Sequence, residues 1–223
     1  MGIPVLVLGK SGSGKSRSIK NFKREEVCVI KAIEKLLPFR NNLYSRTLGN
    51  YDAIKGTLLE INAPSFVIDD AGYLMTTEYL SRGNENGYSK FNDIAKRFYE
   101  LVQFIIYQLP PEKIIYIMMH EDVNDITGEV KPKTVGKMLN ETICIEGMFT
   151  IALRCVNDDL TGHKFITNGK GAKTPEEMFE TNEIENDLKF VDDKIREYYN
   201  IPRSNLKKEN KETKETKEEG EQE

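Results

Sequence analysis

A glycine-rich segment near the start of the chain has the residue types and spacing of a phosphate-binding loop. Glycines permit a tight turn that points successive backbone N–H groups into one hollow, where they bind phosphate oxygens. Lys15 adds a positive charge for the outer phosphates, and the Ser16 hydroxyl is a ligand type that Mg²⁺ accepts. The segment matches G-x-x-x-x-G-K-[ST] at every fixed position: Gly9, Lys10, Ser11, Gly12, Ser13, Gly14, Lys15 and Ser16, with Arg17 following.

The setting of this loop agrees with that chemistry. An apolar run, residues 3–8, precedes it as a strand would, and residues 14–22 are expected to form the helix whose positive end faces the phosphates. The alternative is a glycine-rich turn between two packed elements. A complete motif between a strand and a helix favours nucleotide binding, with ATP and Mg²⁺ as the expected ligands.

A second strand supplies acidic groups. Residues 66–68 are apolar and lead directly into Asp69 and Asp70. At the strand's tip Asp69 is expected to hold Mg²⁺ through water, and Asp70 stands where many such ATPases carry a glutamate that deprotonates the attacking water. Aspartate is one methylene shorter than glutamate. The other interpretation of Asp70 is a helix cap or loop acid beside Ala71 and Gly72.

A third strand, residues 114–119, ends in His120 and Glu121. Ligands of parallel α/β sheets bind at the carboxyl ends of the strands, so either side chain could sense the terminal phosphate. A histidine that caps a strand end for structural reasons is the alternative.

The elements that must position these residues alternate along the chain. Short apolar runs followed by longer amphipathic stretches predict an α/β fold with a mostly parallel sheet flanked by helices. We expect strands at 5–8, 27–30, 65–68 and 114–119, and helices at 14–22, 51–61, 91–108 and 187–199. Residues 149–156 and 163–167, around the turn 157–162, predict a C-terminal antiparallel hairpin.

Composition limits the class of protein. The chain has 223 residues, 39% of them hydrophobic, and a net charge of −4, which gives no global basic signature. One domain is expected over residues 1–202, followed by a lysine- and glutamate-rich tail, 203–223, that is too polar to pack. Three widely spaced cysteines fit neither a zinc site nor a disulfide framework, and no signal peptide or membrane span is evident. A cytoplasmic location is expected.

The order of these parts resembles the core-only RecA-like P-loop ATPases encoded by bacteriophages. The resemblance covers about residues 3–202 and is carried by GKSGSGKS, FVIDDAGYL, IIYIMMHED, ITNGKGAKTPEEMF and NDLKFVDDKIREYY. Proteins of this group are regarded as single-strand annealing or recombination ATPases that cooperate with a single-stranded-DNA-binding protein. The resemblance therefore implies a RecA-like fold, single-stranded DNA and that binding protein as partners, and the cytoplasm of a phage-infected host.

The same resemblance implies a homo-oligomer with ATP at the subunit interface. In RecA-like assemblies, lysines of the adjacent protomer reach the γ-phosphate, and Lys170 and Lys173 are the candidates here; a solvated loop is the alternative for both. The first strand begins about residue 4, without the preceding polymerisation segment of the full recombinase. This counts against a filament of the usual kind and leaves a ring or transient multimer open.

DNA contact is harder to assign from the residues. RecA-like proteins use mobile loops after the central strands, and residues 121–137 contain Lys131, Lys133 and Lys137, which suit a phosphate backbone. Acidic neighbours and the absence of aromatic residues favour an ordinary charged surface loop.

Other functions are weighed against this one. A P-loop kinase needs an arginine-bearing lid, and residues 84–92 and 122–137 contain no arginine. Motor and packaging ATPases need further domains for which the chain has no room. A module in which ATP shifts a DNA-binding conformation without hydrolysis stays open because of the aspartate at position 70.

Overall fold

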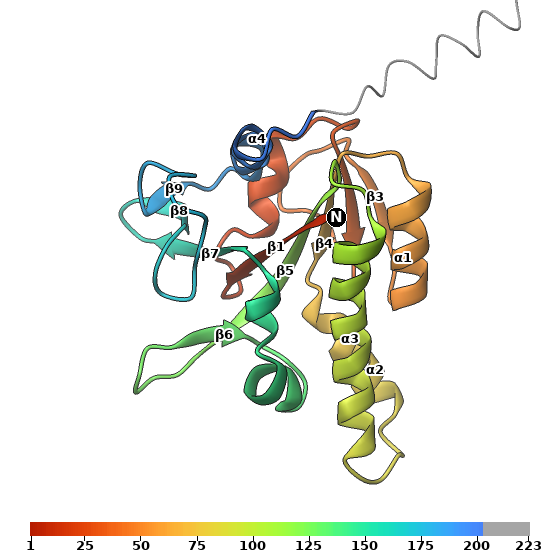
Figure 1. Cartoon of the computed structure of the whole chain (residues 1–223). Helices are drawn as coiled ribbons and strands as arrows, with labels where there is room; N and C mark the ends of the chain where they lie inside the picture. The colour runs from red at the N-terminus through yellow and green to blue at the C-terminus, as the bar shows by residue number, and fades with distance from the viewer. Residues whose placement is uncertain (203–223) are drawn as a thin grey trace, which may run out of the picture.

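The computed structural model describes residues 1–202, and the charged tail lies outside the described residues. Its centre is a twisted sheet in the order β3-β2-β4-β5-β1-β7-β8-β9, with β6 paired to β5 alone. In this order the six strands β3, β2, β4, β5, β1 and β7 are parallel to one another, and β8 and β9 add antiparallel pairs (Figure 1). The predicted fold class is therefore confirmed: α/β, mostly parallel, with a C-terminal antiparallel hairpin.

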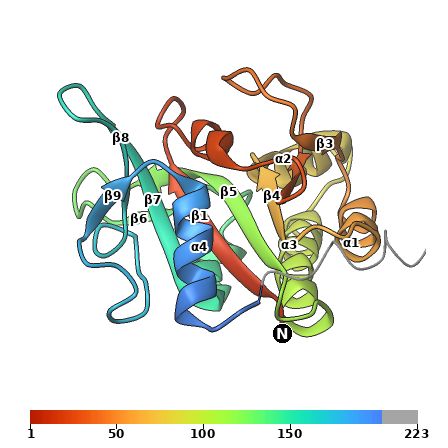
Figure 2. The same ribbon diagram turned by 90° about the horizontal axis from the view of Figure 1, so that it is seen from above.

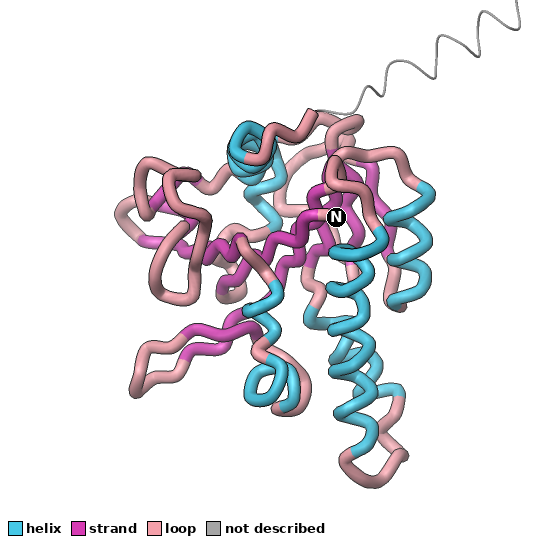
Figure 3. The backbone as a smooth tube through the Cα atoms, viewed as in Figure 1, coloured by secondary structure: helices cyan, strands magenta, loops and turns pink. Residues whose placement is uncertain are grey.

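The elements follow one another closely along the chain (Figure 3). The strands are β1 (Ile3–Gly9), β2 (Val27–Lys31), β3 (Tyr44–Thr47), β4 (Ser65–Asp69), β5 (Ile114–Val123), β6 (Val130–Pro132), β7 (Ile151–Asp158), β8 (Gly162–Ile166) and β9 (Glu183–Glu185). The α-helices are α1 (Tyr51–Glu60), α2 (Gly72–Ser81), α3 (Ser89–Gln108) and α4 (Leu188–Tyr198). Shorter helical turns are η1 (Ser16–Asn21, 3₁₀), η2 (Met138–Ile143, π) and η3 (Ile145–Met148, 3₁₀).

The sheet separates two hydrophobic cores because successive strand residues face opposite sides. On one face Leu6 and Leu8 of β1 pack with the apolar sides of α1, α2 and α3. On the other face Val5 and Val7 pack with η1 and α4 (Figure 2). Burial of the sheet on both sides explains why its central strands are near-continuous apolar runs.

A buried polar network fixes α4 to the sheet. Asp192 accepts hydrogen bonds from Ser65 and Tyr116 and forms an ion pair with Arg196, at 2.8 Å. Arg196 also donates to the carbonyl oxygens of Glu112 and Pro64, so its buried charge has hydrogen-bond acceptors besides Asp192. Burial, followed by the charge of Asp192, holds the pKa of Tyr116 well above its usual range. The network lies at the amino ends of β4 and β5, away from the glycine loop.

Several boundaries differ from the expectation. The helix predicted over 14–22 is only the six-residue 3₁₀ turn η1, and the Ser18 hydroxyl hydrogen-bonds to the Lys15 carbonyl at 2.6 Å. Such a bond competes with α-helical pairing. Part of the expected loop at 121–137 is instead an antiparallel strand pair, because β5 continues to Val123 and pairs with β6.

Among residues 1–202, no helix is both long and apolar enough to cross a bilayer.

Candidate nucleotide-binding site

The glycine loop encloses the ammonium group of Lys15. Its Nζ donates to the carbonyl oxygens of Gly9 at 2.8 Å and Lys10 at 3.0 Å, and the residue is only 5% exposed. Burial lowers the pKa of Lys15, while the charges of Asp70 and Asp69 act in the opposite direction. A cation held by weak carbonyl acceptors is well placed to exchange them for phosphate oxygens. Lys10, Ser11, Gly12 and Arg17 are exposed around it, whereas Ser13 is buried.

Ser16 and Asp69 meet at the end of β4. The hydroxyl of Ser16 lies 3.0 Å from each carboxylate oxygen of Asp69, which is 1% exposed. A hydroxyl and a carboxylate are oxygen ligands of the kind that Mg²⁺ accepts, and Mg²⁺ usually completes its shell with water and substrate phosphates. Within the described part of the chain, no group of three or more His, Cys, Asp or Glu side chains is arranged to hold a metal. The Ser16–Asp69 pair supplies two of the oxygen ligands that Mg²⁺ accepts.

Asp69 is held in a setting that disfavours its charge. Burial raises the pKa of its carboxyl group, and the neighbouring Asp70 adds to this, while Lys35, Ser16 and Lys15 lower it. A cation at this position would relieve the unfavourable burial of the charge.

Asp70 lies beside Asp69 and faces two basic side chains. Its backbone is left-handed, with φ of 56°, a conformation that aspartate tolerates better than most residues. One oxygen forms an ion pair with Lys35, and the other lies 3.6 Å from His120 Nε2. The N–H of the next residue, Ala71, donates to the Met118 carbonyl, which joins the β4 end to β5.

His120 is a half-buried imidazole. Burial lowers its pKa, and the charge of Lys15 lowers it further, with Asp70 opposing them. Its ring meets that of Tyr73 edge to face at 6.2 Å. The structure thus brings Lys15, Ser16, Asp69, Asp70 and His120 to one end of the sheet, where the sequence predicted a common site.

Glu121, the other candidate at this strand end, is engaged elsewhere. It forms a bidentate ion pair with Arg154 of β7, at 2.8 and 2.9 Å, and its side chain is 2% exposed. His120 is therefore the residue of this strand end that faces the acidic pair.

Residues of β7 and β8 contact the glycine loop at Ser13 and Gly14. His163 Nδ1 lies 2.9 Å from the Ser13 carbonyl oxygen, and Cys155 donates to the same oxygen at 3.0 Å. Gly14 has φ of 103°, and a Cβ there would lie 2.8 Å from His163 Nδ1. Burial raises the pKa of Cys155 to about 11, so its thiol is protonated and acts as a donor.

A cavity of about 550 Å³ opens beside the loop. Lys10 and Ser11 line it from the loop, Tyr73 from α2, and Lys133 from the segment after β6. His120 also lines it, and its Nε2 lies 3.6 Å from the Asp70 carboxylate, so this residue lies between the cavity and the acidic pair.

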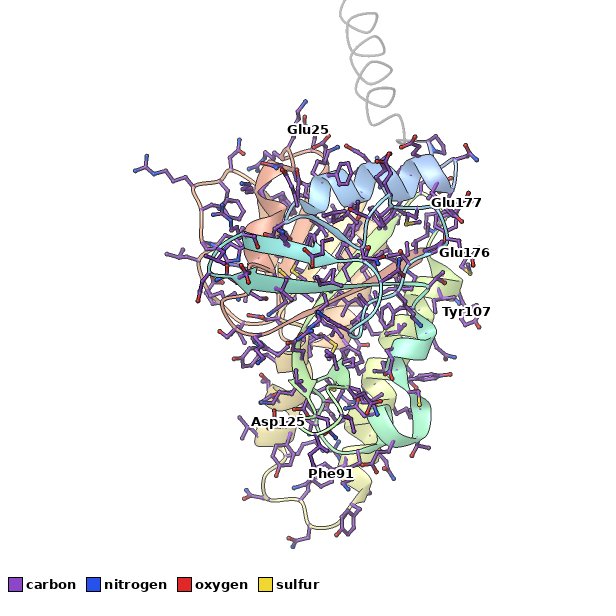
Figure 4. The ribbon with its side chains drawn as sticks, turned by 90° about the vertical axis from the view of Figure 1, so that its left-hand side faces the viewer. Glu25, Phe91, Tyr107, Asp125, Glu176 and Glu177 are labelled. Carbon is purple, nitrogen blue, oxygen red and sulfur yellow. The ribbon has the colours of Figure 1, made fainter. Side chains whose placement is uncertain are left out.

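Lys170 and Lys173 lie outside this cluster. Both are exposed, and the backbone of Lys173 pairs with Ala152, near the start of β7 and below the level of the loop. In Figure 4 the labelled Glu176 and Glu177, which follow these lysines, lie well apart from Asp125 on the β5–β6 hairpin. A role for either lysine in a neighbouring protomer's site remains a prediction.

The three lysines of residues 121–137 have separate surroundings. Lys131 forms an ion pair with Glu129 at 3.0 Å, and Lys137 forms one with Glu141 at 3.4 Å. Lys133 lines the cavity.

Comparison with known proteins gives remote likenesses among solved structures. No family model and no curated protein matches the chain. Among solved structures, it is similar to a KaiC-like protein, PH0186, of the archaeon Pyrococcus horikoshii OT3, with 13% identity and a TM-score of 0.43 over 74% of this chain and 77% of that one. What the site can do follows from its own geometry.

Two features of the site escaped sequence reasoning. Lys35 lies in a loop that matches no motif. His163 and Cys155 lie in the predicted hairpin, but the sequence did not indicate that they contact the glycine loop. No spacing rule places such residues, because they reach the site through tertiary folding alone.

Proposed function

We propose that this chain binds ATP with Mg²⁺, hydrolyses it, and uses the cycle to act on single-stranded DNA in annealing or recombination. The observation that carries the ATP half is the arrangement of Lys15 inside a complete glycine loop with Ser16 placed on Asp69. These are the parts that a P-loop NTPase needs for the phosphates and for the cation.

Each residue has a role in this proposal. Backbone N–H groups of the loop and the Lys15 ammonium bind the phosphates; because η1 is a short 3₁₀ turn, the loop and Lys15 rather than a long helix supply the positive potential. Ser16 and Asp69 would hold Mg²⁺, which supplies charge neutralisation at the phosphates when bound. Asp70 is the candidate base for water, and His120, 3.6 Å from Asp70, is the candidate sensor of the terminal phosphate.

The DNA half rests on the resemblance to phage recombination ATPases. The β5–β6 hairpin and the segment after it suit this role in position, since Lys133 lines the cavity next to the loop and Lys131 lies on β6. Contacts there would be with the phosphate backbone, which needs lysines and no base reading. A homo-oligomer with Lys170 and Lys173 at a neighbour's nucleotide, and cooperation with a single-stranded-DNA-binding protein, belong to the same proposal.

The decisive experiment measures ATP turnover with and without single-stranded DNA, together with annealing of complementary strands. Wild-type protein should turn over ATP faster with DNA, and Lys15→Ala should lose turnover. Lys96→Ala is the matched control, because Lys96 is exposed on α3, a helix that carries none of the site residues. If neither ATP turnover nor annealing responds to DNA, the DNA half fails; if ATP does not bind, the whole proposal fails.

A second candidate is a module that binds ATP and DNA without hydrolysis. The observation that favours it is the ion pair between Asp70 and Lys35, which occupies an oxygen of the candidate base. Nucleotide-dependent DNA binding with no measurable turnover would support this second function. Transfer of phosphate to a nucleotide or small metabolite in the same assay would instead indicate a kinase.

A further inference from the structure

Lys35 is a cation of the site that belongs to no motif. Its Nζ forms an ion pair with Asp70 and lies 3.6 Å from the nearer oxygen of Asp69. The two carboxylate side chains are 7% and 0% exposed, and adjacent buried carboxylates need a cation nearby. Lys15 donates to backbone carbonyls instead, so Lys35 is the lysine that contacts the pair.

The loop between β2 and β3 holds Lys35 in this place. Lys31 at the end of β2 donates through its Nζ to the Lys35 carbonyl at 3.2 Å. The Ala32 N–H donates to the Asp69 carbonyl at 3.1 Å, which ties the loop's start to the end of β4. Leu43, before β3, is buried in the core on the α4 side. Figure 2 shows this loop and the glycine loop beyond the carboxyl ends of the central strands.

The charge of Lys35 is well maintained there. Burial lowers the pKa of its ammonium, but the hydrogen bond to Asp70 and the charges of both aspartates raise it more, and the net direction is upward.

The ammonium of Lys35 lies close to the place where Ser16 and Asp69 are suited to hold a divalent cation. Asp69 would then be contacted by a divalent cation while Lys35 lies 3.6 Å away, and two cations on one acidic pair repel each other. The Lys35 side chain is 35% exposed and flexible, so it can leave the pair. Under the proposed function, the terminal phosphate of ATP would be the anion available to a lysine displaced from this pair.

We propose that Lys35 is the resident counter-ion of Asp69 and Asp70 in the nucleotide-free protein and moves to the terminal phosphate of bound ATP. It thereby acts from within the same chain as an arginine finger does from a neighbour. Its departure leaves Asp70 free to accept a proton from water, so hydrolysis is coupled to the presence of a terminal phosphate. This inference rests on the proposed function.

The expected consequence is that Lys35 determines discrimination between ATP and ADP. ADP has no terminal phosphate to meet the ammonium, so its affinity should change less than threefold in Lys35→Met. Affinity for a non-hydrolysable imido analogue of ATP should fall about 10-fold to 100-fold, the range for a lost charge-assisted contact.

The test is calorimetric titration of ADP and of the imido analogue, both with Mg²⁺, into wild type, Lys35→Met and Lys35→Arg. Lys35→Arg retains the charge and should retain the affinity ratio of the two nucleotides. Lys96→Met, on an exposed helix position, is the matched control, and thermal melting checks that each variant is folded.

A second pair of variants separates a phosphate contact from a purely structural counter-ion. In Asp70→Asn the acidic pair has one charge fewer and needs Lys35 less. If the ATP analogue still loses affinity on going from Asp70→Asn to Asp70→Asn/Lys35→Met, the lysine contacts the phosphate.

The outcomes distinguish the two proposals. Wild type that binds neither nucleotide overturns the proposed function and this inference with it. Wild type that binds both, with an unchanged affinity ratio in Lys35→Met or an equal loss for both nucleotides, overturns this inference alone.

Discussion

Ser13 and His163, 150 residues apart in the chain, meet at the back of the glycine loop, where His163 Nδ1 lies 2.9 Å from the Ser13 carbonyl oxygen. The contact leaves no room beside the next residue, Gly14. The shape of the loop thus depends on a strand from the C-terminal hairpin as well as on the glycines of the motif.

Gly14→Ala should therefore abolish nucleotide binding. The added methyl group would lie 2.8 Å from His163 Nδ1 in a backbone with φ of 103°, so the loop must shift. Gly128→Ala is the matched control, because Gly128 also has positive φ, at 70°, nothing lies within 4 Å of its Cβ position, and it lies outside the glycine loop. That variant should lose only about 1–2 kcal/mol of stability through strain. Titration of ADP into both variants measures the difference; equal losses would contradict the crowding argument.

Protonation of His120 should destabilise the folded protein. Because the folded protein holds the pKa of His120 below its ordinary value, the unfolded chain binds more protons between the two values. The stabilising contribution is complete above the unfolded pKa, about 6.5, and is lost as the pH falls through the folded value. Urea unfolding at pH 7, 6 and 5 should show a steeper loss for wild type than for His120→Gln. Parallel curves for the two proteins would refute this assignment.

Loss of the Asp192 network should lower the free energy of unfolding and should not change nucleotide affinity. Asp192→Ala strands the buried Arg196 guanidinium and is expected to cost about 3–5 kcal/mol of unfolding free energy. Glu197→Ala is the control on the same helix, where the exposed i,i+3 pair of Glu197 with Lys194 should contribute under about 1 kcal/mol. Urea denaturation gives both values. ADP affinity measured below the melting transition should equal that of wild type.

The three cysteines should differ sharply in reactivity. Cys144 is exposed, whereas burial raises the pKa of both Cys28 and Cys155 to about 11. Since the thiolate is the reactive form, a disulfide reagent should modify one thiol quickly in the native protein and all three in urea. Cys144→Ser should remove the fast phase. Fast modification of a second thiol would mean that the loop's support opens readily.

The sequence allowed the central strands to be predicted because β1, β4 and β5 are apolar runs with the chemistry at their ends. It did not indicate β3 or α2. Strand β3 is a short edge strand with alternating partial exposure, and α2 follows directly from Asp70 with little separation of polar and apolar sides.

The site was predictable to the extent that it is local. Residues 9–16 form one loop, and Asp69, Asp70 and His120 follow apolar strands whose parallel ends meet. Lys35 was not predictable because its contact with Asp70 depends on the path of an irregular loop.

The contacts of β7 and β8 with the glycine loop have a consequence for synthesis of the protein. When the first hundred residues have left the ribosome, the whole glycine loop is already outside it. His163 and Cys155 have not yet been synthesised. Under the proposed function, the nascent chain should therefore be unable to retain ATP until β7 and β8 have been synthesised, so that nucleotide binding would follow the folding of this hairpin.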